Sequence, residues 1–412
     1  MKSIENIINS STNRLIELTQ DIYGLQTPRR SLAIGKASHS SFINIERGNI
    51  IIDGKASTID VKINTDFQGE LSLIRLAKNI KNVTLTNLKI KVHFVGEHSN
   101  NKFYCIYNCS EELKIENCSI EVISDSQINL YGIYNYGDKS ETWNANADTV
   151  SICNNRIYVD CRATTFPNTC HLYGIYNTVG GSLSVVNNYI NVNNDGNGDK
   201  QVAIGIYTDG MYGRFIGNNI KAQTPHIRGV SREKAYTVGF KNAGQYSLIS
   251  DNNIVSERGG SSIGLDNAAL QVKITGNKIL STHTIWGITV RNSGAQAIIS
   301  SNLILSTAKN GRLLEQTTHS SIITSNLIRT SVIPPLAITN CGIYAPSKDA
   351  HHNIIADNII KDVLNCGIYC NILDNTISNN EILSDNDSIT KISEPNLKFN
   401  TLFDENSVKS IE

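Results

Sequence analysis

Residues 251–282, DNNIVSERGGSSIGLDNAALQVKITGNKILST, contain the repeat that decides the fold of this chain. The phrase DNNIVS at 251–256 returns as GNKILS at 276–281, and both read as an Asn, any residue, an Ile and an extended tail. A different phrase, IGLDN at 263–267, lies between the two copies. Internal repeats with a period of roughly 20 to 50 residues are typical of solenoids.

Copies of the first phrase continue in both directions along the chain. The spacing between neighbouring copies ranges from 22 residues (Ile360 to Ile382) to 37 residues (Ile120 to Ile157). Such spacing indicates a coil of constant size that carries loops of variable length. The isoleucines of the series are Ile90, Ile120, Ile157, Ile190, Ile220, Ile254, Ile279, Ile304, Ile328, Ile360 and Ile382.

Both phrases alternate apolar and other side chains, which is the period of β-strands and not of helices. An Asn precedes each Ile by two places in the nine copies from Asn155 to Asn380, which predicts a ladder of stacked amides at a turn where Asn adopts left-handed backbone angles. Copies of the second phrase are YGIYN at 131–135 and 173–177, IGIYT at 204–208, VGFKN at 238–242, IGLDN at 263–267, WGITV at 286–290, CGIYA at 341–345 and CGIYC at 366–370.

These phrases, with GNIIIDGKASTI at 48–59, resemble the repeats of the pectin-lyase-like superfamily, which includes pectate lyases, polygalacturonases, alginate epimerases and phage tailspike depolymerases. The resemblance covers roughly residues 45–385 and implies an all-β fold, a right-handed single-stranded parallel β-helix of about eleven to twelve coils. Residues 1–44 are expected to form a cap with a helix over residues 3–24. Residues 386–412 are expected to form a C-terminal cap or tail, because an open coil exposes unpaired strand edges.

The composition limits the classes of partner. The 412 residues carry a formal net charge of zero, which argues against nucleic acid as a partner. No apolar run approaches the roughly 20 residues of a membrane span, and the N-terminus lacks the apolar core of a secretion signal. The nine cysteines have no paired spacing and read as reduced thiols, which predicts synthesis in the cytosol. No cofactor or metal is expected, since no His or Asp cluster has ligand spacing.

One outward-facing column is the predicted functional surface. The Gly of the second phrase serves as a register mark, after which the next residue points inward and the following one outward. Charged residues then occupy the middle coils between tyrosines, whose flat faces and hydroxyls suit sugar rings. The predicted column is Tyr134, Tyr176, Tyr207, Lys241, Asp266, Thr289, Glu315, Tyr344 and Tyr369.

Asp266 and Glu315 are the predicted catalytic carboxylates. They lie two coils apart, about 2 × 4.8 Å or roughly 9.6 Å, close to the separation of about 6.5–9.5 Å that an inverting glycosidase uses. Lys241 is a third catalytic candidate, and Arg291 is expected to bind a uronate or sialate carboxylate. His319, just past Glu315, is a further candidate for proton transfer or substrate binding. A surface ion pair between Lys241 and Asp266 is the purely structural alternative.

The leading hypothesis is a protein that binds and cleaves an acidic bacterial surface polysaccharide. Hydrolysis with Asp266 and Glu315 as acid and base is favoured over a lyase reaction, in which Lys241, Tyr207 and Arg291 would be the catalytic groups. A non-catalytic carbohydrate-binding or structural β-helix, such as a tail fibre or adhesin, is the second hypothesis. An intracellular uronate epimerase or lyase is the third. The tailspike members of the family imply a virion-associated homotrimer, which would agree with reduced cysteines and a missing secretion signal.

Overall fold

The chain consists of two compact units, Met1–Arg214 (unit 1) and Phe215–Glu412 (unit 2). The computed structural model describes residues 4–23, 39–55, 57–63, 69–95, 101–126, 128–136, 150–163, 169–178, 182–196, 200–225, 235–282, 286–308, 310–330, 339–363, 366–370, 374–384, 390–393, 401–402 and 408–410.

In unit 1 the described strands form three parallel sheets, A, B and C. Sheet A contains β1 (Leu15–Glu17), β4 (Ile50–Asp53), β7 (Val83–Thr86), β10 (Leu113–Glu116), β13 (Val150–Cys153) and β16 (Leu183–Val186). Sheet B contains β2 (Ile22–Tyr23), β5 (Thr58–Ile63), β8 (Lys89–Phe94), β11 (Ser119–Ser124), β14 (Arg156–Cys161) and β17 (Tyr189–Asn194). Sheet C contains β3 (His39–Ile45), β6 (Glu70–Leu76), β9 (Lys102–Asn108), β12 (Asn129–Asn135), β15 (Thr169–Asn177) and β18 (Lys200–Thr208).

Unit 2 repeats the same three sheets. Its sheet A strands are β19 (Arg214–Ile216), β22 (Leu248–Ser250), β25 (Lys273–Thr275), β28 (Ile298–Ser300), β31 (Ile322–Thr324), β34 (Ile354–Ala356), β37 (Thr376–Ser378) and β40 (Thr401–Leu402). Its sheet B strands are β20 (Asn219–Gln223), β23 (Asn253–Glu257), β26 (Lys278–Thr282), β29 (Leu303–Ser306), β32 (Leu327–Thr330), β35 (Ile359–Lys361), β38 (Glu381–Ser384) and β41 (Val408–Ser410). Its sheet C strands are β21 (Ala235–Asn242), β24 (Ser261–Asn267), β27 (Gly287–Asn292), β30 (Asn310–Gln316), β33 (Thr339–Ala345), β36 (Cys366–Cys370) and β39 (Thr390–Ser393).

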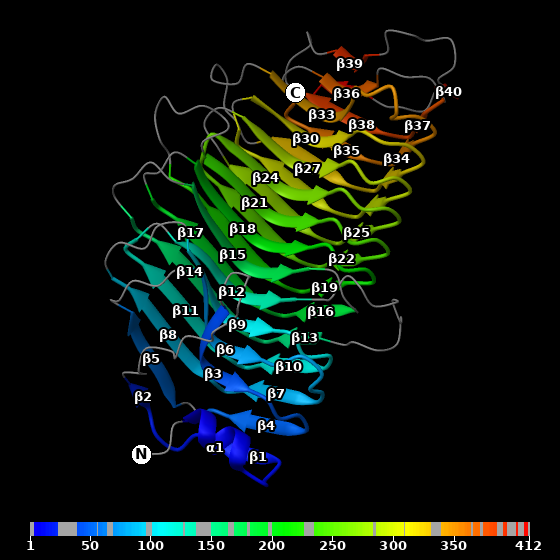
Figure 1. Ribbon diagram of the computed structural model, residues 1–412. Helices are drawn as coiled ribbons and strands as arrows, with labels where there is room; N and C mark the ends of the chain where they lie inside the picture. Colours follow the sequence, from blue (N-terminus) through cyan, green and yellow to red (C-terminus); the bar gives the residue numbers. More distant parts are fainter. Residues whose placement is uncertain are drawn as a thin grey trace. The chain divides into compact units, whose positions relative to one another are not determined.

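Within each unit, a strand pairs in parallel with the strand three places later in the chain. In unit 1, for example, β10 lies between β7 and β13, and Figure 1 shows β8, β11, β14 and β17 of sheet B side by side. The chain therefore visits the three sheets in turn, and crossovers between parallel strands are right-handed in about 98% of cases. Each unit is a right-handed parallel β-helix, as the repeats predict.

The isoleucines of the first phrase form the core at sheet B. In unit 2, Ile254, Ile279 and Ile304 are register partners on neighbouring strands, and each has none of its surface exposed. Ile120, Ile157 and Ile190 are paired in the same way in unit 1. The predicted inward position of these side chains is confirmed, and their stacking contributes the apolar burial that holds successive coils together.

The asparagines two places before the isoleucines form the predicted ladder. In unit 2 the side-chain amide of Asn277 donates to Oδ1 of Asn302 at 3.0 Å, and the amide of Asn302 donates to Oδ1 of Asn326 at 3.0 Å. The predicted left-handed conformation is found one residue earlier in the chain than expected, for example at Ser301, whose φ is 57°. The ladder asparagines are buried because their amides bond backbone groups of neighbouring coils.

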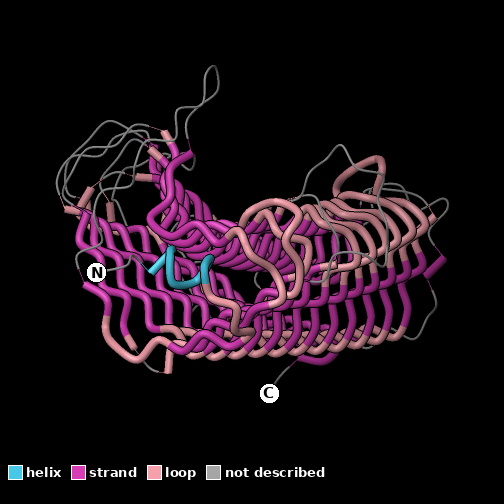
Figure 2. Tube along the Cα trace, turned by 60° about the horizontal axis from the view of Figure 1, so that its bottom comes forward, coloured by secondary structure: helices cyan, strands magenta, loops and turns pink. Residues whose placement is uncertain are grey.

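The N-terminus differs from the predicted cap. Helix α1 spans only Ile4–Ser10, cyan in Figure 2, and it packs against β3. The helix ends at the polar stretch 9–13, and residues 15–18 then alternate between exposed and buried, which is the period of a strand. Because β1 pairs with β4 and β2 pairs with β5, the first coil of unit 1 includes residues that the repeats had assigned to the cap.

Past residue 385, the described residues are the strands β39, β40 and β41, which pair with β36, β37 and β38. All nine cysteines are free thiols, and seven of them are buried. None of the helices in the described parts of the chain is long and apolar enough to cross a membrane.

Candidate functional site

The outer face of sheet C in unit 1 carries a ladder of four tyrosines. Tyr107, Tyr134, Tyr176 and Tyr207 occupy the same register position on β9, β12, β15 and β18. Their ring centroids lie 5.2, 5.2 and 4.6 Å apart, and the angles between ring planes are 4°, 5° and 17°. The tyrosines predicted in this unit therefore lie together on one face.

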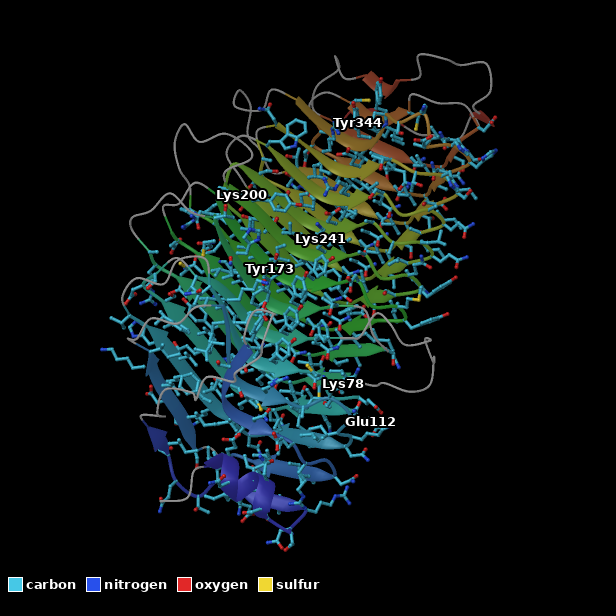
Figure 3. The ribbon with its side chains drawn as sticks, viewed as in Figure 1. Lys78, Glu112, Tyr173, Lys200, Lys241 and Tyr344 are labelled. Carbon is cyan, nitrogen blue, oxygen red and sulfur yellow. The ribbon has the colours of Figure 1, made fainter. Side chains whose placement is uncertain are left out.

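A second tyrosine column, which the repeats did not predict, runs beside the first. Tyr104, Tyr131 and Tyr173 are register partners, and Figure 3 labels Tyr173 in β15. The ring of Tyr131 lies 4.9 Å from that of Tyr173 and meets the ring of Tyr134 edge-on at 5.4 Å. Unit 1 thus has two parallel rows of tyrosines, together the tyrosine face, and in the second row Tyr104 and Tyr131 are buried beside the first row.

A break in the strand alternation brings both rows to the outside. A Cβ on Gly132 would lie 2.7 Å from the side chain of Ile157 in the core, so the glycine faces inward, and Ile133 after it is also buried. Two successive inward residues leave Tyr131 and Tyr134 on the same outer face. Strict alternation would have placed Tyr131 inside, and the recurring Tyr directly before the Gly is the signal that could have revealed the second row.

The stacking decides which part of each tyrosine can meet a ligand. Neighbouring rings of the first row cover one another's faces, so the stacked faces are closed to a sugar, and the edges and hydroxyl groups are the parts of the rings that a ligand could reach. Burial, with a smaller contribution from Tyr207, raises the pKa of Tyr176 to about 12. Its hydroxyl therefore stays protonated at neutral pH and can donate a hydrogen bond.

Glu70 forms a charged cluster beside the tyrosine face. Its carboxylate lies 3.4 Å from Nδ1 of His39 and 3.0 Å from the Lys102 ammonium, and the ring of His39 stacks on Tyr104. The hydrogen bond from His39, aided by Lys102 and opposed by burial, lowers the pKa of Glu70 to about 2. The repeats gave no signal for this cluster, because it joins residues from three separate coils.

Glu70→Gln is expected to destabilise the protein at neutral pH by about 1 to 2 kcal/mol, after allowance for solvent screening. The pKa is lower in the folded state than its ordinary value of 4.5, so the stabilisation is complete above that pH and disappears as the pH falls to about 2. Urea unfolding of both proteins over this range measures the difference. A constant difference at all pH values would contradict the assignment.

In unit 2 the outer face of sheet C carries a column of charged residues. Asp266 pairs in register with Lys241 on one side and with Arg291 on the other, and Arg291 pairs with Glu315. Tyr344 and Tyr369 follow, with stacked rings 5.0 Å apart. Figure 3 labels Lys241 and Tyr344 on this face, and the column is called the charged column.

The predicted position of Thr289 in this column is wrong. Arg291 occupies the rung between Asp266 and Glu315, whereas Thr289 is fully buried and donates to the carbonyl of Leu305 at 3.0 Å. The alignment failed because it used Gly287 as the register mark of this coil. In the structure Gly287 pairs with Ser262 and Gly311, and not with Gly264, the Gly of the preceding phrase. The backbone of Thr289 lies beside Gly264, in the position that the Gly of the phrase has elsewhere.

A second amide ladder gives the correct register. Asn267, the last residue of the phrase IGLDN, pairs in register with Asn292 in the next coil, and Asn292 pairs with Gln316 in the third. Their side chains are joined by hydrogen bonds of 2.7 and 2.8 Å. In unit 1, Asn135 and Asn177 are joined in the same way. Alignment on this amide residue, instead of the Gly, would have placed Arg291 correctly from the sequence.

Asp266 is held by Arg291 in a bidentate ion pair. Nε and Nη2 of Arg291 lie 2.8 and 2.5 Å from the two carboxylate oxygens, and the Asp266 side chain is 3% exposed. The carboxylate raises the pKa of the guanidinium. Burial, and to a smaller extent the charge of Asp266, raises the pKa of the neighbouring Tyr236 to about 12. Arg291 thus occupies one position on each carboxylate oxygen of Asp266, and each oxygen keeps one further lone pair for a ligand or a water.

The Glu315 carboxylate is buried, and only one of its two oxygens has a polar partner. Its Oε1 lies 2.9 Å from Nη1 of Arg312, whereas Oε2 has no hydrogen-bond partner in the described part of the chain. The residue is 8% exposed. Arg312 in turn lies 3.8 Å over the ring of Tyr344 and 5.2 Å from that of Trp286. A buried carboxylate oxygen without a partner is costly and has the free lone pairs that a ligand hydroxyl would need.

His319 does not join this group. It lies in the turn after β30, where its ring stacks on that of His351 at 5.2 Å and Nδ1 lies 3.2 Å from the Ser320 hydroxyl. No contact joins it to Glu315 among the residues that the structure places. The sequence proximity of His319 and Glu315 was misleading, because the chain turns between them.

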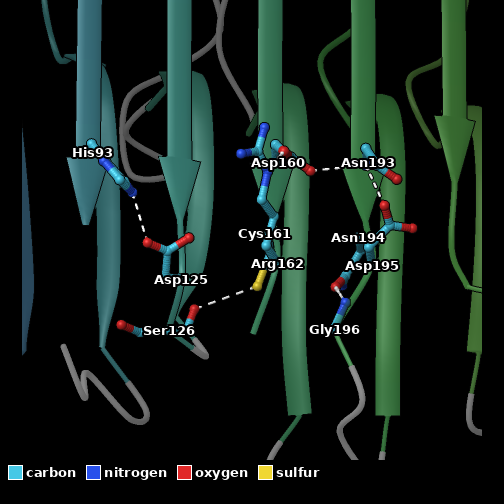
Figure 4. Close-up of polar contacts among 10 residues, drawn as sticks. All are labelled: His93, Asp125, Ser126, Asp160, Cys161, Arg162, Asn193, Asn194, Asp195 and Gly196. Carbon is cyan, nitrogen blue, oxygen red and sulfur yellow. Dashed lines mark hydrogen bonds and ion pairs between the residues drawn. The ribbon is translucent and has the colours of Figure 1, made fainter. Parts of the chain in front are cut away.

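A further polar cluster lies at the ends of the sheet B strands in unit 1 (Figure 4). His93 bonds Asp125 at 2.8 Å, and Asp160 is bonded both by Arg162 at 2.6 Å and by Asn193 at 2.9 Å. These acids are satisfied by their neighbours. Within the described ranges, no three His, Cys, Asp or Glu side chains are placed to hold a metal ion.

No protein-family model matches the chain, and no curated protein matches it in sequence. Among solved structures, the Dettilon tailspike protein is similar, with a TM-score of 0.42 and 11% identity over 85% of this chain and 63% of that chain. The chain thus spans less than two thirds of the tailspike. DFA-IIIase from Arthrobacter chlorophenolicus A6 in complex with DFA-III is also similar, with a TM-score of 0.43 and 12% identity over 87% of this chain and 89% of that chain. At these identities the similarity is one of fold.

Proposed function

We propose that the chain binds an acidic polysaccharide on the outer face of sheet C and hydrolyses it, with Glu315 as general acid and Asp266 as general base. The unpartnered buried oxygen of Glu315 carries this proposal. A proton donor must lie within hydrogen-bond reach of the glycosidic oxygen, and Oε2 is the one carboxylate oxygen of the charged column that is buried, unpartnered and described.

Asp266 supplies the other half of the reaction. Arg291 fixes the position of the carboxylate, and the remaining lone pairs of Asp266 would orient a water and take its proton as the glycosidic bond breaks. The proton from Glu315 goes to the leaving oxygen, and the water oxygen bonds to the sugar carbon. Two rungs separate the carboxylates, about 9.6 Å along the helix, which leaves room for the water of an inverting reaction.

The cations of the charged column define the substrate class. Lys241 and Arg291 flank Asp266 in register, and Arg312 lies beside Glu315. Uronate or sialate carboxylates are the sugar substituents that such groups bind through charge-assisted hydrogen bonds. In unit 1, the hydroxyl edges of Tyr134, Tyr176 and Tyr207 would bind sugar hydroxyls.

Binding without cleavage is the second proposal, and the Asp266–Arg291 ion pair favours it. A bidentate pair of this kind also stabilises a surface with no catalytic role. In that case the tyrosine face of unit 1 and the charged column of unit 2 would each be an adhesive surface. A lyase or epimerase reaction with Lys241 as base is the third, as the cations beside Asp266 would also stabilise a carbanion next to a uronate carboxylate.

Incubation with a panel of acidic and neutral bacterial polysaccharides tests these proposals. Hydrolysis predicts shorter chains without the ultraviolet absorbance of an unsaturated uronate, and a lyase predicts both. Binding without any shortening would favour the adhesive surface. An altered uronate without shortening would indicate an epimerase.

Tyr176→Phe tests the role of the hydroxyl edges. Loss of one neutral hydrogen bond is expected to weaken polysaccharide binding by about two- to tenfold. Tyr189→Phe is the matched control, because Tyr189 is a 40% exposed tyrosine of sheet B in the same unit. Equal affinities for the two variants would exclude the tyrosine face from binding.

A further inference from the structure

Unit 2 exposes a compact group of aliphatic side chains at the starts of its sheet A and sheet B strands. Ile298, Ile322 and Ile354 are successive register partners in sheet A and are 39%, 36% and 42% exposed. Leu303, Leu327 and Ile359 are the corresponding partners in sheet B, and the last two are 36% and 37% exposed. These six residues, the aliphatic strip, form one apolar column in sheet A and one in sheet B over three consecutive coils, with the exposed turn residues Ser301, Ser325 and Asp357 between the columns. Neighbouring exposed apolar side chains mark interaction sites.

The strip is bounded by opposite charges. One rung before it, the same two positions hold Lys273 and Lys278, both exposed. One rung after it, they hold Thr376 and Glu381. Counted from the central rung at Leu327, Lys278 lies two rungs to one side and Glu381 two rungs to the other. The sheet B column is therefore apolar in the middle with opposite charges at equal distances, and it is complementary to a reversed copy of itself.

Polar residues occupy the equivalent sheet B positions in three consecutive coils of unit 1. In unit 1 the first residues of β8, β11 and β14 are Lys89, Ser119 and Arg156, in mutual register. The repeat itself therefore does not require aliphatic side chains at these exposed positions. Solvent exposure normally favours polar residues there, so the three aliphatic rungs indicate a surface that is covered in the functional state.

We infer that two copies of this chain associate through the aliphatic strip. The two copies are related by a two-fold axis that lies in the plane of the interface, perpendicular to the helix axis, at the level of Leu327. This axis places Leu327 against its own counterpart and Ile298 against Ile354 of the second copy. It also places Lys278 of each copy opposite Glu381 of the other, so the interface is isologous and electrostatically complementary. A parallel arrangement would instead place Lys278 against Lys278.

The strip is small, and this sets the strength of the association. Three rungs extend about 9.6 Å along the helix, and stable interfaces bury roughly 800 Å² per partner. The dimer is accordingly expected to be weak and to form in a concentration-dependent manner. It does not depend on the proposed polysaccharide function, because none of the six residues lies on sheet C.

Sedimentation velocity of the full chain over a range of concentrations measures the association. The wild-type protein is expected to pass from monomer to dimer as the concentration rises. Leu327→Glu is expected to raise the dissociation constant at least about tenfold, because it places two facing carboxylates in the apolar centre. Ser119→Glu, at the equivalent position in unit 1, should leave association unchanged.

Charge reversal tests the two-fold geometry. Lys278→Glu and Glu381→Lys each place two like charges opposite one another across the interface, and each is expected to weaken the dimer by about three- to tenfold. The double variant K278E/E381K restores opposite charges and should restore the dimer. Circular dichroism of each variant verifies that it is folded. A monomer at all concentrations, a trimer as the tailspike resemblance implies, or a double variant weaker than either single variant would overturn the inference.

Discussion

Glu315→Gln is expected to lower the rate of polysaccharide cleavage by about 10²- to 10⁴-fold, the range that a general acid contributes. The substitution keeps the size of the side chain and a hydrogen bond to Arg312, but it removes the proton that Oε2 would deliver. Binding of the intact polysaccharide should change far less, because the cations and tyrosines proposed to contact it remain. The initial rate of chain shortening, measured by size-exclusion chromatography, provides the readout.

Glu257→Gln is the matched control. Glu257 is a carboxylate of unit 2 that lies 3.0 Å from Lys221 on sheet B, away from the charged column, and its substitution should leave the rate unchanged. Asp266→Asn is expected to cost a similar factor to Glu315→Gln if it is the base. Full activity of both variants would eliminate hydrolysis by this pair, and inactivity of Lys241→Ala alone would favour the lyase reaction.

Asn302→Ala is expected to lower the free energy of unfolding by about 3 to 5 kcal/mol, the largest stability effect predicted for a single side chain of this fold. Oδ1 of Asn302 accepts from the backbone and side-chain amides of Asn277, and its own amide donates to the carbonyl of Ile274. Truncation would remove these bonds from the buried backbone N–H of Asn277 and from the carbonyl of Ile274, at about 1 to 3 kcal/mol each before relaxation, whereas the side-chain amide of Asn277 keeps its bonds to the carbonyls of Ile249 and Thr275. Urea unfolding followed by circular dichroism measures the loss.

Two further variants separate hydrogen bonding from packing. Asn302→Asp keeps the volume but directs an oxygen at the carbonyl of Ile274 and at Oδ1 of Asn326, so it should destabilise more than Ala does. Ser300→Ala, in the same coil, removes one 3.3 Å hydroxyl bond and should cost less than about 1 kcal/mol. An Asp variant as stable as the wild type would show that packing, and not the amide ladder, holds the coils together.

The repeat predicted the elements that depend on local chemistry. The alternation around Ile254 and Ile279 and the recurring Asn252 and Asn277 specify which side chains face the core and where the chain turns, and all four are buried as expected. The error at Thr289 arose because a glycine marks register only when it has the same structural role in every coil. At the N-terminus, the spacing of a few apolar residues was compatible with both a helix and a strand. Residues 15–17 form a strand because they pair with β4.

The sequence by itself determined the β-helix, its isoleucine core, its amide ladder and the face on which the tyrosines and charged residues lie, because these follow from strand alternation and turn chemistry within one coil. Only the tertiary structure decided that Arg291 neutralises Asp266, that Glu315 keeps a free oxygen, and that tyrosine rings cover one another's faces. These features depend on contacts between coils, such as the Asp266–Arg291 pair at a separation of 25 residues. Loops of variable length set the register of such contacts, so the stacking of the coils is what fixes the chemistry of the surface.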